Sequence, residues 1–420
     1  MTTLLPSREP QGFQTPASSM DAQTLDSARG IVDTVRREGD KALRGYIDSF
    51  EQRTGDPLLL DREALESACA RIPETRLALL QRTADRIRRF ADAQRSCITP
   101  LEMPIPGGFA GHSLAPVEKA ACYAPGGRFP LPSSVLMTAV TARSAGVAEV
   151  WVVTPSSEDV MLAAAAVAGA DGVIWAGGAQ AIAAVAFGTE SVPQVDIIVG
   201  PGNRWVTAAK QLVSGQVGID MLAGPSELVV LADETANPAW VAADLIAQAE
   251  HDPDAVPILV TTSEPLIVQV REELEAQLEA LDTAPIAAES LRGGAALWCE
   301  SLEQGIEVVN AIGPEHLEVQ LQAIDEVVPR LKSYGGLFIG SGSAEVLGDY
   351  GAGPNHVLPT SGTSRYTGGL SVFDFLRVRT WMKLDTAQQA QELFEDAEAL
   401  ARVEGLSGHA ASARIRSSKP

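Results

Sequence analysis

Four of the five histidines in this chain lie in short segments rich in acidic, amide or glycine residues. The segments are QAEH, GPEH, GDYGAGPNH and EGLSGH, which end at His251, His316, His356 and His409. Imidazole groups in such surroundings are candidates for metal ligands and proton carriers. Each segment alone is more often a capping or core arrangement than a functional one. A functional interpretation therefore requires several of them to act together.

Gln248 and His251 are candidates for a metal site. They are three residues apart near the end of a predicted helix that begins at about Pro238, so they share one helix face. An amide oxygen and an imidazole nitrogen need two further ligands, for which Asp349 and His409 are the best candidates. This thiolate-free set favours Zn²⁺ and leaves Mn²⁺ and Co²⁺ open. Alternatively, Gln248 caps carbonyl groups and His251 interacts with the helix dipole.

Glu315 and His316 are adjacent, directly after a Gly-Pro turn that follows a predicted helix. A rigid turn restricts both side chains, and the pKa of each can be set separately. His316 could then accept a proton from an alcohol, while Glu315 helps a water molecule attack the resulting aldehyde. The alternative is an ordinary surface turn.

Nucleotide binding is indicated less directly. No GxGxxG follows a predicted strand, so the usual dinucleotide fingerprint is absent. The GPGN segment at 200–203 opens a predicted helix directly after a strand, and such helix starts can accept phosphates or polar ligand edges. Tyr123 precedes a Pro-Gly-Gly turn and could border a nicotinamide or an adenine ring. As tight structural turns, these segments would need no ligand.

The elements that must position these residues form an alternating pattern from about residue 149 to 340. Short β-branched runs alternate with Ala-rich or amphipathic stretches, which predicts parallel strands joined by helices. The expected strands are VWVV, VIWA, VDIIVG, ELVVLAD, PILVT and GLFIG. Several expected strands end in glycine-rich turns at the edge where doubly wound folds bind ligands. Residues up to about 93 predict helices without strands, and the last fifty residues are expected to be mainly helical.

Composition excludes several classes of partner. The 32 Lys and Arg against 54 Asp and Glu give a net charge of −22, which disfavours nucleic acids and anionic membranes. Four scattered cysteines without a CxxC pair predict neither a disulfide framework nor a thiolate zinc cluster. We find no export signal and no membrane span, so a cytoplasmic location is expected.

Longer motifs, in order, resemble the histidinol dehydrogenase family over nearly the whole chain. They are YAPGG followed by PSSVLM, GGAQAIAAVAFGTE, VGPGN, VGIDMLAGPSELVVLADETANP, AADLIAQAEHDP, GPEHLE, GDYGAGPNHVLPTSGTSRYTGGLSV and VEGLSGHA. The segments EKAAC, PGGRFP and YTGGLSV, which include loops bordering the NAD site, depart from the commoner family spellings. None of these departures touches a matched site residue.

This resemblance implies an α/β fold of two incomplete Rossmann-like domains with parallel sheets, plus small helical segments at both ends. The implied units are an N-terminal helical arm at 1–25, a larger domain at 26–122 and 226–370 with the metal and catalytic residues, an NAD-contacting domain at 123–225, and a C-terminal helical segment at 371–420 that completes the active site.

The resemblance also implies the activity and its cofactors. L-Histidinol would be oxidised through L-histidinal to L-histidine with two NAD⁺, the last step of histidine biosynthesis, by a homodimer whose C-terminal segments complete each other's sites. One Zn²⁺ per subunit would be held by Gln248, His251, Asp349 and His409. Glu315 and His316 would transfer protons.

Further contacts are implied residue by residue. NAD would be contacted by Tyr123, Gln180 and Asn203. The substrate would contact the metal ligands and the proton-transfer pair, and also Ser226, His356 and Glu404.

Two competing interpretations remain at this point. One is a related zinc- and NAD-dependent dehydrogenase of the same fold that acts on another small alcohol. The other is a non-catalytic protein with a structural zinc site and glycine turns that merely pack. A structural zinc site would be expected to use thiolates in closed coordination, which this set lacks.

Overall fold

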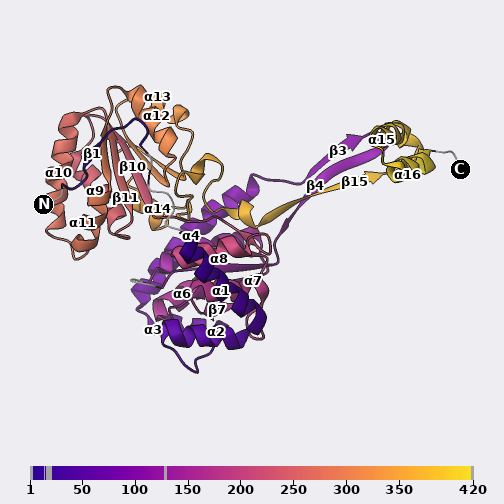
Figure 1. Ribbon diagram of the computed structural model, residues 1–420, viewed down its shortest axis with the longest axis horizontal. Coiled ribbons are helices and arrows are strands. Elements are labelled where there is room, and N and C mark those ends of the chain that lie inside the picture. Colours follow the sequence, from indigo (N-terminus) through magenta and orange to yellow (C-terminus); the bar gives the residue numbers. More distant parts are fainter. Residues whose placement is uncertain (1–2, 14, 16–20, 127–129, 418–420) are drawn as a thin grey trace.

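The computed structural model describes residues 3–13, 15, 21–126 and 130–417. Figure 1 shows two lobes side by side and a long arm that extends away from them and carries the C-terminus. Each lobe is built on a six-stranded sheet, and the arm on a three-stranded one.

The sheet of the first lobe is parallel except for its edge strand β2, which pairs antiparallel with β7. Its order is β2 (Leu59–Leu60), β7 (Gly172–Trp175), β6 (Glu149–Thr154), β5 (Lys119–Tyr123), β8 (Ile197–Val199) and β9 (Gly218–Ile219). One face packs on α3 (Arg62–Arg71), α4 (Glu74–Ser96), α5 (Pro132–Ala145) and α6 (Asp159–Ala168). The other packs on α1 (Ala22–Glu38), α2 (Asp40–Tyr46), the π-helix η1 (Ile47–Glu51), α7 (Gly178–Phe187) and α8 (Arg204–Val213).

The sheet of the second lobe is parallel throughout. Its order is β1 (Ser7–Arg8), β12 (Ala295–Trp298), β11 (Val256–Thr261), β10 (Glu227–Ala232), β13 (His316–Gln320) and β14 (Gly336–Ile339). One face packs on α9 (Pro238–Ala249), α10 (Glu264–Leu278) and α11 (Ala284–Gly293). The other packs on α12 (Leu302–Ile312) and α13 (Ile324–Val327), which the 3₁₀ turn η2 (Val328–Arg330) follows.

The arm consists of two segments far apart in the sequence. Its antiparallel sheet has the order β15 (Leu376–Leu384), β4 (Gly108–Pro116), β3 (Leu101–Ile105), and two helices, α15 (Gln391–Val403) and α16 (Ser407–Ser417), lie at its far end. The remaining short elements are α14 (Val346–Asp349) and the 3₁₀ turns η3 (Thr363–Arg365), η4 (Val372–Phe375) and η5 (Gln388–Ala390).

The strand β13 is buried on both faces but is not apolar on both. Leu317 and Val319 point into the core beneath α12. Because side chains alternate along a strand, His316, Glu318 and Gln320 share the opposite face. All three are buried, with 4% or less of each exposed. A row of buried polar side chains in a central strand is costly unless it has partners or a function.

The predicted fold class is confirmed, since two largely parallel sheets are covered by helices, and the six expected strand segments correspond to β6, β7, β8, β10, β11 and β14. No helix in the described part of the chain is long and apolar enough to cross a membrane.

Several expected details were wrong. The first residues include the strand β1, which pairs with β12, so this part of the arm expected at 1–25 is not helical. The last fifty residues are mainly helical as expected, in α15 and α16, but their described part also contains the nine-residue strand β15, whose partner β4 is more than 250 residues away in the sequence. A strand of this kind depends on long-range pairing that local propensity does not register.

The domain boundaries also differ from those expected. Residues 26–122 were grouped with 226–370, but Val32, Leu43 and Ile87 pack in the cores of the first lobe, with the segment 123–225. The sequence shows that these helices are amphipathic, but not which of two similar sheets their apolar faces cover.

Candidate active site

Most of the candidate residues lie between the two lobes. They lie at the carboxyl edge of the sheet in the first lobe and at the amino edge of the sheet in the second lobe. In the first lobe, Tyr123 ends β5, and Gln180 and Asn203 follow β7 and β8 at the carboxyl edge. In the second lobe, Ser226 and Glu315 precede β10 and β13. The expected position after carboxyl strand ends therefore holds for the first lobe only. In the second lobe the site lies at the amino edge, to which the C-terminal end of α9 returns.

Asp349, the last residue of α14, lies among three histidines. Its Oδ2 atom is 3.3 Å from His251 Nε2, and its Oδ1 atom is 3.9 Å from His316 Nε2 and 3.8 Å from His356 Nδ1. Burial alone would raise the pKa of Asp349, but the three imidazoles outweigh it and hold that pKa at about 2. The Asp349 carboxylate is therefore an anion at neutral pH and can hold a cation.

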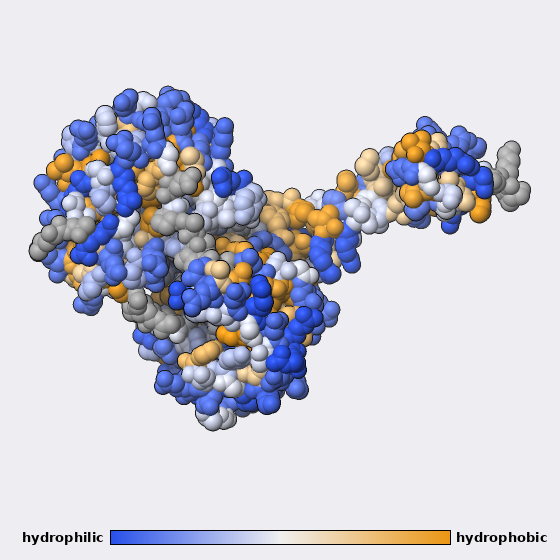
Figure 2. Space-filling model, viewed as in Figure 1, coloured by the Kyte–Doolittle hydropathy of each residue, from blue (hydrophilic) through white to orange (hydrophobic). Residues whose placement is uncertain are grey.

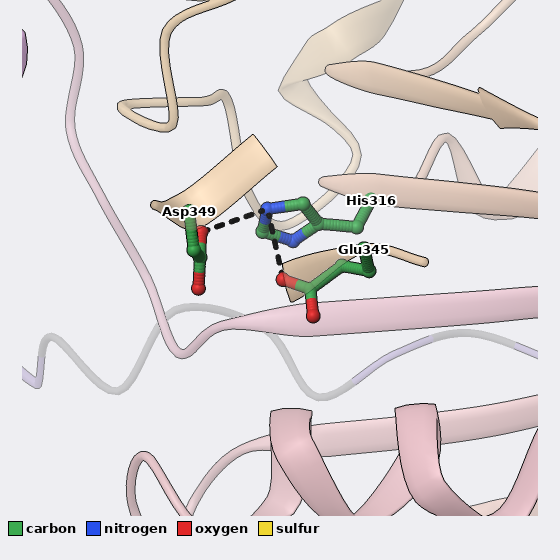
Figure 3. A group of neighbouring side chains, drawn as sticks. All are labelled: His316, Glu345 and Asp349. Atoms are coloured by element: carbon green, nitrogen blue, oxygen red, sulfur yellow. Dashed lines mark ion pairs between the residues drawn. The ribbon is translucent and has the colours of Figure 1, made fainter. Parts of the chain in front are cut away.

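The orientation of His316 is fixed by a hydrogen bond to the backbone. Its Nδ1 atom lies 3.2 Å from the carbonyl oxygen of Glu227, which can only accept, so Nδ1 carries the proton. The lone pair on Nε2 then points toward Glu345 Oε1, at 3.5 Å (Figure 3). Burial lowers the pKa of His316 to about 4. A neutral imidazole with a free Nε2 lone pair is suited to accept a proton.

Glu315 is buried beside His316. Its Oε2 atom accepts a hydrogen bond from the backbone N–H of Glu227 at 2.9 Å and lies 3.7 Å from His316 Nδ1. Burial raises the pKa of Glu315 well above its ordinary value, and the neighbouring carboxyl groups of Glu227, Asp349 and Glu345 raise it further. Since 6% or less of each residue is exposed, the pair does not form an ordinary surface turn.

Gln248 is fully buried in the last turn of α9, with 0% exposed. Both atoms of its side-chain amide lack a hydrogen-bond partner among the described residues. The alternative in which Gln248 caps carbonyl groups is therefore not observed. A buried unpaired amide costs about 1–3 kcal/mol. An oxygen ligand to a metal ion would remove this cost, and His251 lies in the turn after the same helix.

The remaining predicted ligand, His409, is not brought to this cluster within the chain. His409 lies on α16 and Glu404 directly after α15, and both are exposed. Figure 1 shows α15 and α16 at the far end of the arm, well away from α9 and α14. Of the four predicted ligands, the structure therefore brings His251 and Asp349 into direct contact, and Gln248 lies three residues before His251 at the end of α9.

A cavity of about 1750 Å³ connects the cluster with the predicted cofactor residues. Its lining includes His251 and Asp349 from the cluster, Ser226 from the start of β10, and Tyr123, Gln180 and Asn203. A cavity of this size can hold a dinucleotide and a small substrate together. The predicted cofactor residues thus share one space with His251 and Asp349, whereas Gln248 and His409 do not line the cavity.

The loops that carry the predicted cofactor residues are held by polar contacts within the first lobe. The Tyr123 hydroxyl accepts from the Gly178 N–H at 3.2 Å, and Gln180 Nε2 donates to Glu51 Oε1 at 3.3 Å. Asn203 caps α8 by accepting from the N–H groups of Trp205 and Val206. Residues 127–129, in the loop after Tyr123 whose spelling departs from the family, lie outside the described residues.

A buried ion pair fixes the GPGN loop. Lys210 Nζ donates to the Gly200 carbonyl oxygen at 3.0 Å and pairs with Asp220, whose other oxygen accepts from the Gly200 N–H at 2.6 Å. Gly200 has a φ of 110°, and a Cβ there would overlap the carbonyl oxygen of Tyr123. The N–H and the carbonyl group of Gly200 are therefore both hydrogen-bonded, and this restricts the position of Asn203 three residues later.

His356 and Glu345 complete the surroundings of Asp349. His356 Nδ1–H donates to the Asp349 carbonyl at 3.0 Å, and His356 Nε2 lies 3.4 Å from Ser134 Oγ. Glu345 is buried at the start of α14, and burial together with Asp349 raises its pKa to about 9. Sequence reasoning missed Glu345. Its spacing of four residues before Asp349, which places both on one helix face, was the available signal.

Comparisons with known proteins agree with this arrangement. The sequence model of the family described as histidinol dehydrogenase matches residues 14–417. Histidinol dehydrogenase of Pseudomonas savastanoi pv. phaseolicola is 42% identical over 413 residues, 96% of this chain and 90% of the relative. That of Methanosarcina mazei is 44% identical over 400 residues, 94% of this chain and 92% of the relative.

A solved structure gives the same result for the fold. The crystal structure of histidinol dehydrogenase from Elizabethkingia anophelis superposes with a TM-score of 0.92 at 32% identity, covering 99% of this chain and 98% of that one. On these grounds the chain belongs to the histidinol dehydrogenase family.

Proposed function

We propose that this chain oxidises L-histidinol through L-histidinal to L-histidine with two NAD⁺, the last step of histidine biosynthesis. The observation that carries the proposal is His316, a buried neutral imidazole whose free Nε2 points at the Asp349 cluster. That cluster opens into a cavity that also contains Tyr123, Gln180 and Asn203. Family membership supplies the substrate and the cofactors.

Gln248, His251 and Asp349 are the residues that would hold Zn²⁺, one per subunit. The buried unpaired amide of Gln248 and the nitrogen and oxygen atoms of His251 and Asp349 fit a borderline cation without thiolates. When bound, Zn²⁺ would anchor the imidazole and amine of histidinol, both borderline donors. The far end of the substrate is thereby held while its carbinol carbon lies near His316.

His316 and Glu315 divide the proton transfers between them. NAD⁺ would accept the hydride in each oxidation step. In both oxidation steps His316 Nε2 accepts a proton, first from the alcohol and then from the hydrated aldehyde; between the two steps it returns the first proton to the aldehyde oxygen as water adds. Glu315 helps a water molecule attack the aldehyde between the two oxidations. Its raised pKa makes the deprotonated carboxylate a stronger base than an ordinary Glu.

The aldehyde has to remain bound between the two oxidations. Converting CH₂OH to COO⁻ removes four electrons, so two NAD⁺ react in succession at one site. Ser226, His356 and Glu404 are proposed to hold the substrate beside the metal ligands. Binding energy at these remote groups keeps the reacting carbon in place through both hydride transfers.

The functional unit is proposed to be a homodimer in which the C-terminal segment of one subunit completes the site of the other. Glu404 and His409 are exposed and lie on the distant arm. Figure 2 shows hydrophobic side chains along that arm. Large ones that are exposed there include Met103, Val378, Met382, Leu400, Val403 and Ile415. A two-fold pair would bury such a surface reciprocally.

Replacing Glu315 by Gln should separate the two halves of the reaction. The substitution keeps the shape but removes the carboxylate that activates water, so oxidation of added L-histidinal should slow more than oxidation of L-histidinol to the aldehyde level. A loss of about 10²- to 10⁴-fold is typical of a missing general base. Single-turnover formation of NADH from each substrate measures the two steps.

The matched variant is His316→Asn, which should impair both steps because each requires a proton to be accepted. Equal losses in the two steps for Glu315→Gln would show that Glu315 has no particular role in the second one.

A second candidate function is oxidation of another small alcohol by the same fold. Comparing the turnover of L-histidinol with that of amino alcohols lacking the imidazole separates the two. Preference for an alcohol without an imidazole would overturn the proposed substrate.

A further inference from the structure

The two oxygens of Asp349 face different sets of ligand atoms. Asp349 Oδ2 lies 3.3 Å from His251 Nε2, on the side of the proposed zinc ligands. Asp349 Oδ1 lies 3.9 Å from His316 Nε2, and His316 Nε2 lies 3.5 Å from Glu345 Oε1. Figure 3 shows His316, Glu345 and Asp349 with these three atoms turned toward one another.

The separations within the second set are somewhat longer than those around a bound metal ion. Ligand atoms at about 2.0–2.1 Å from a tetrahedral Zn²⁺ lie about 3.3–3.4 Å apart. His316, Glu345 and Asp349 each offer one possible ligand atom, and these three atoms all lie within 4.8 Å of one another. A cation between them would therefore require only small movements of side chains.

Unsatisfied polar atoms point to a ligand at this position. His316 Nε2 and Glu345 Oε1 are both buried and lack a hydrogen-bond partner among the described residues. His316 is 4% exposed and Glu345 1% exposed. The hydrogen bond from His316 Nδ1–H to the Glu227 carbonyl keeps the Nε2 lone pair directed at the gap. Orphaned buried atoms of this kind need a partner that the protein alone does not supply.

We propose that His316, Glu345 and Asp349 form a second, weaker divalent-cation position that shares Asp349 with the zinc site and inhibits the enzyme when occupied. Asp349 bridges the two positions through its two oxygens, as carboxylates do in paired metal sites about 3.5–4 Å apart. The position takes a borderline cation such as Zn²⁺, because one imidazole and two carboxylates form its ligand set.

Inhibition follows from the identity of one ligand. A cation on His316 Nε2 occupies the lone pair that accepts the proton from the alcohol, and it fills the space where the carbinol end of the substrate would lie. Excess Zn²⁺ should therefore inhibit competitively with histidinol. This inference rests on the proposed function for the role of His316, whereas the cation position itself depends only on the geometry.

The test is a titration of the full-length protein with Zn²⁺ at buffered free concentrations, followed by metal analysis. Wild type should bind two equivalents per chain, the second weaker than the first, and Glu345→Gln should bind one. In parallel assays, the Zn²⁺ concentration needed to inhibit should rise about tenfold or more in Glu345→Gln, since even groups beyond the ligands change metal affinity about 10- to 100-fold.

Glu275→Gln is the matched control. Glu275 is exposed on α10 and does not line the cavity, so the variant makes the same substitution outside both positions. It should keep two equivalents and wild-type inhibition. Zn²⁺ adsorbed elsewhere on this acidic chain contributes equally to all three proteins. Thermal unfolding of each protein without metal shows whether the variants fold, and Glu345→Asp, which keeps a carboxylate, should restore part of the second equivalent.

A single equivalent in wild type, or an unchanged second equivalent in Glu345→Gln, would overturn the inference and leave the proposed function intact. Wild type that binds no zinc tightly would contradict both.

Discussion

Mixing two inactive variants, His316→Ala and His409→Ala, should restore about a quarter of wild-type activity once the subunits exchange. Each variant alone should be inactive, because one lacks the proposed proton acceptor and the other a proposed metal ligand. If the C-terminal segment acts in the partner's site, a mixed dimer contains one doubly damaged site and one intact site. Equal amounts that exchange at random give about half mixed dimers, hence about a quarter of the sites intact.

The structural reason for expecting this result is the position of the arm. His409 and Glu404 are exposed and lie far from the lobes, whereas His251 and Asp349 lie together between them. Activity that stays at zero after verified exchange, measured by native mass spectrometry of tagged subunits, would show that each chain supplies its own His409. A fully active monomer would equally contradict the proposal.

Removing the metal should abolish turnover, and Zn²⁺ should restore it. Without the cation, His251 and Asp349 attract each other directly and Gln248 remains unpaired, so the site offers little to bind the imidazole and amine of histidinol. Calorimetry of the chelated protein should show the loss of histidinol binding. NAD⁺ binding should change little, because Tyr123, Gln180 and Asn203 are held by contacts within the first lobe.

The control is chelated protein with Zn²⁺ added back in one equivalent, which should recover both binding and turnover. Histidinol affinity that is the same with and without metal would exclude the anchoring role.

The sequence predicted those strands whose apolar pattern is visible within the strand itself, and it missed those that depend on residues elsewhere in the chain. The β-branched runs of β6, β7, β8, β10, β11 and β14 are recognisable because buried parallel strands are apolar on both faces. The strand β13 was missed because His316, Glu318 and Gln320 interrupt its apolar pattern. The two-residue strands β1 and β2 are too short to produce a pattern, and β15 acquires its strand form through pairing with β4.

The same distinction applies to the site. His251, His316, His356 and Asp349 were all identified from their local segments, and the structure brings them together. Glu227, Glu345 and Lys210 were missed because what makes them important is burial and a partner distant in sequence. The placement of His409 away from the cluster could not be predicted from spacing either, since it depends on where the arm lies.

The measurement that tests the central claim most directly is the number of NADH molecules formed for each L-histidinol consumed, followed to completion. Absorbance at the NADH band gives one quantity, and chromatography of histidinol, histidinal and histidine gives the other. A four-electron oxidation at one site predicts a ratio of two, with histidine as the product and no free histidinal accumulating. A ratio of one, with histidinal released into solution, would contradict the proposed function.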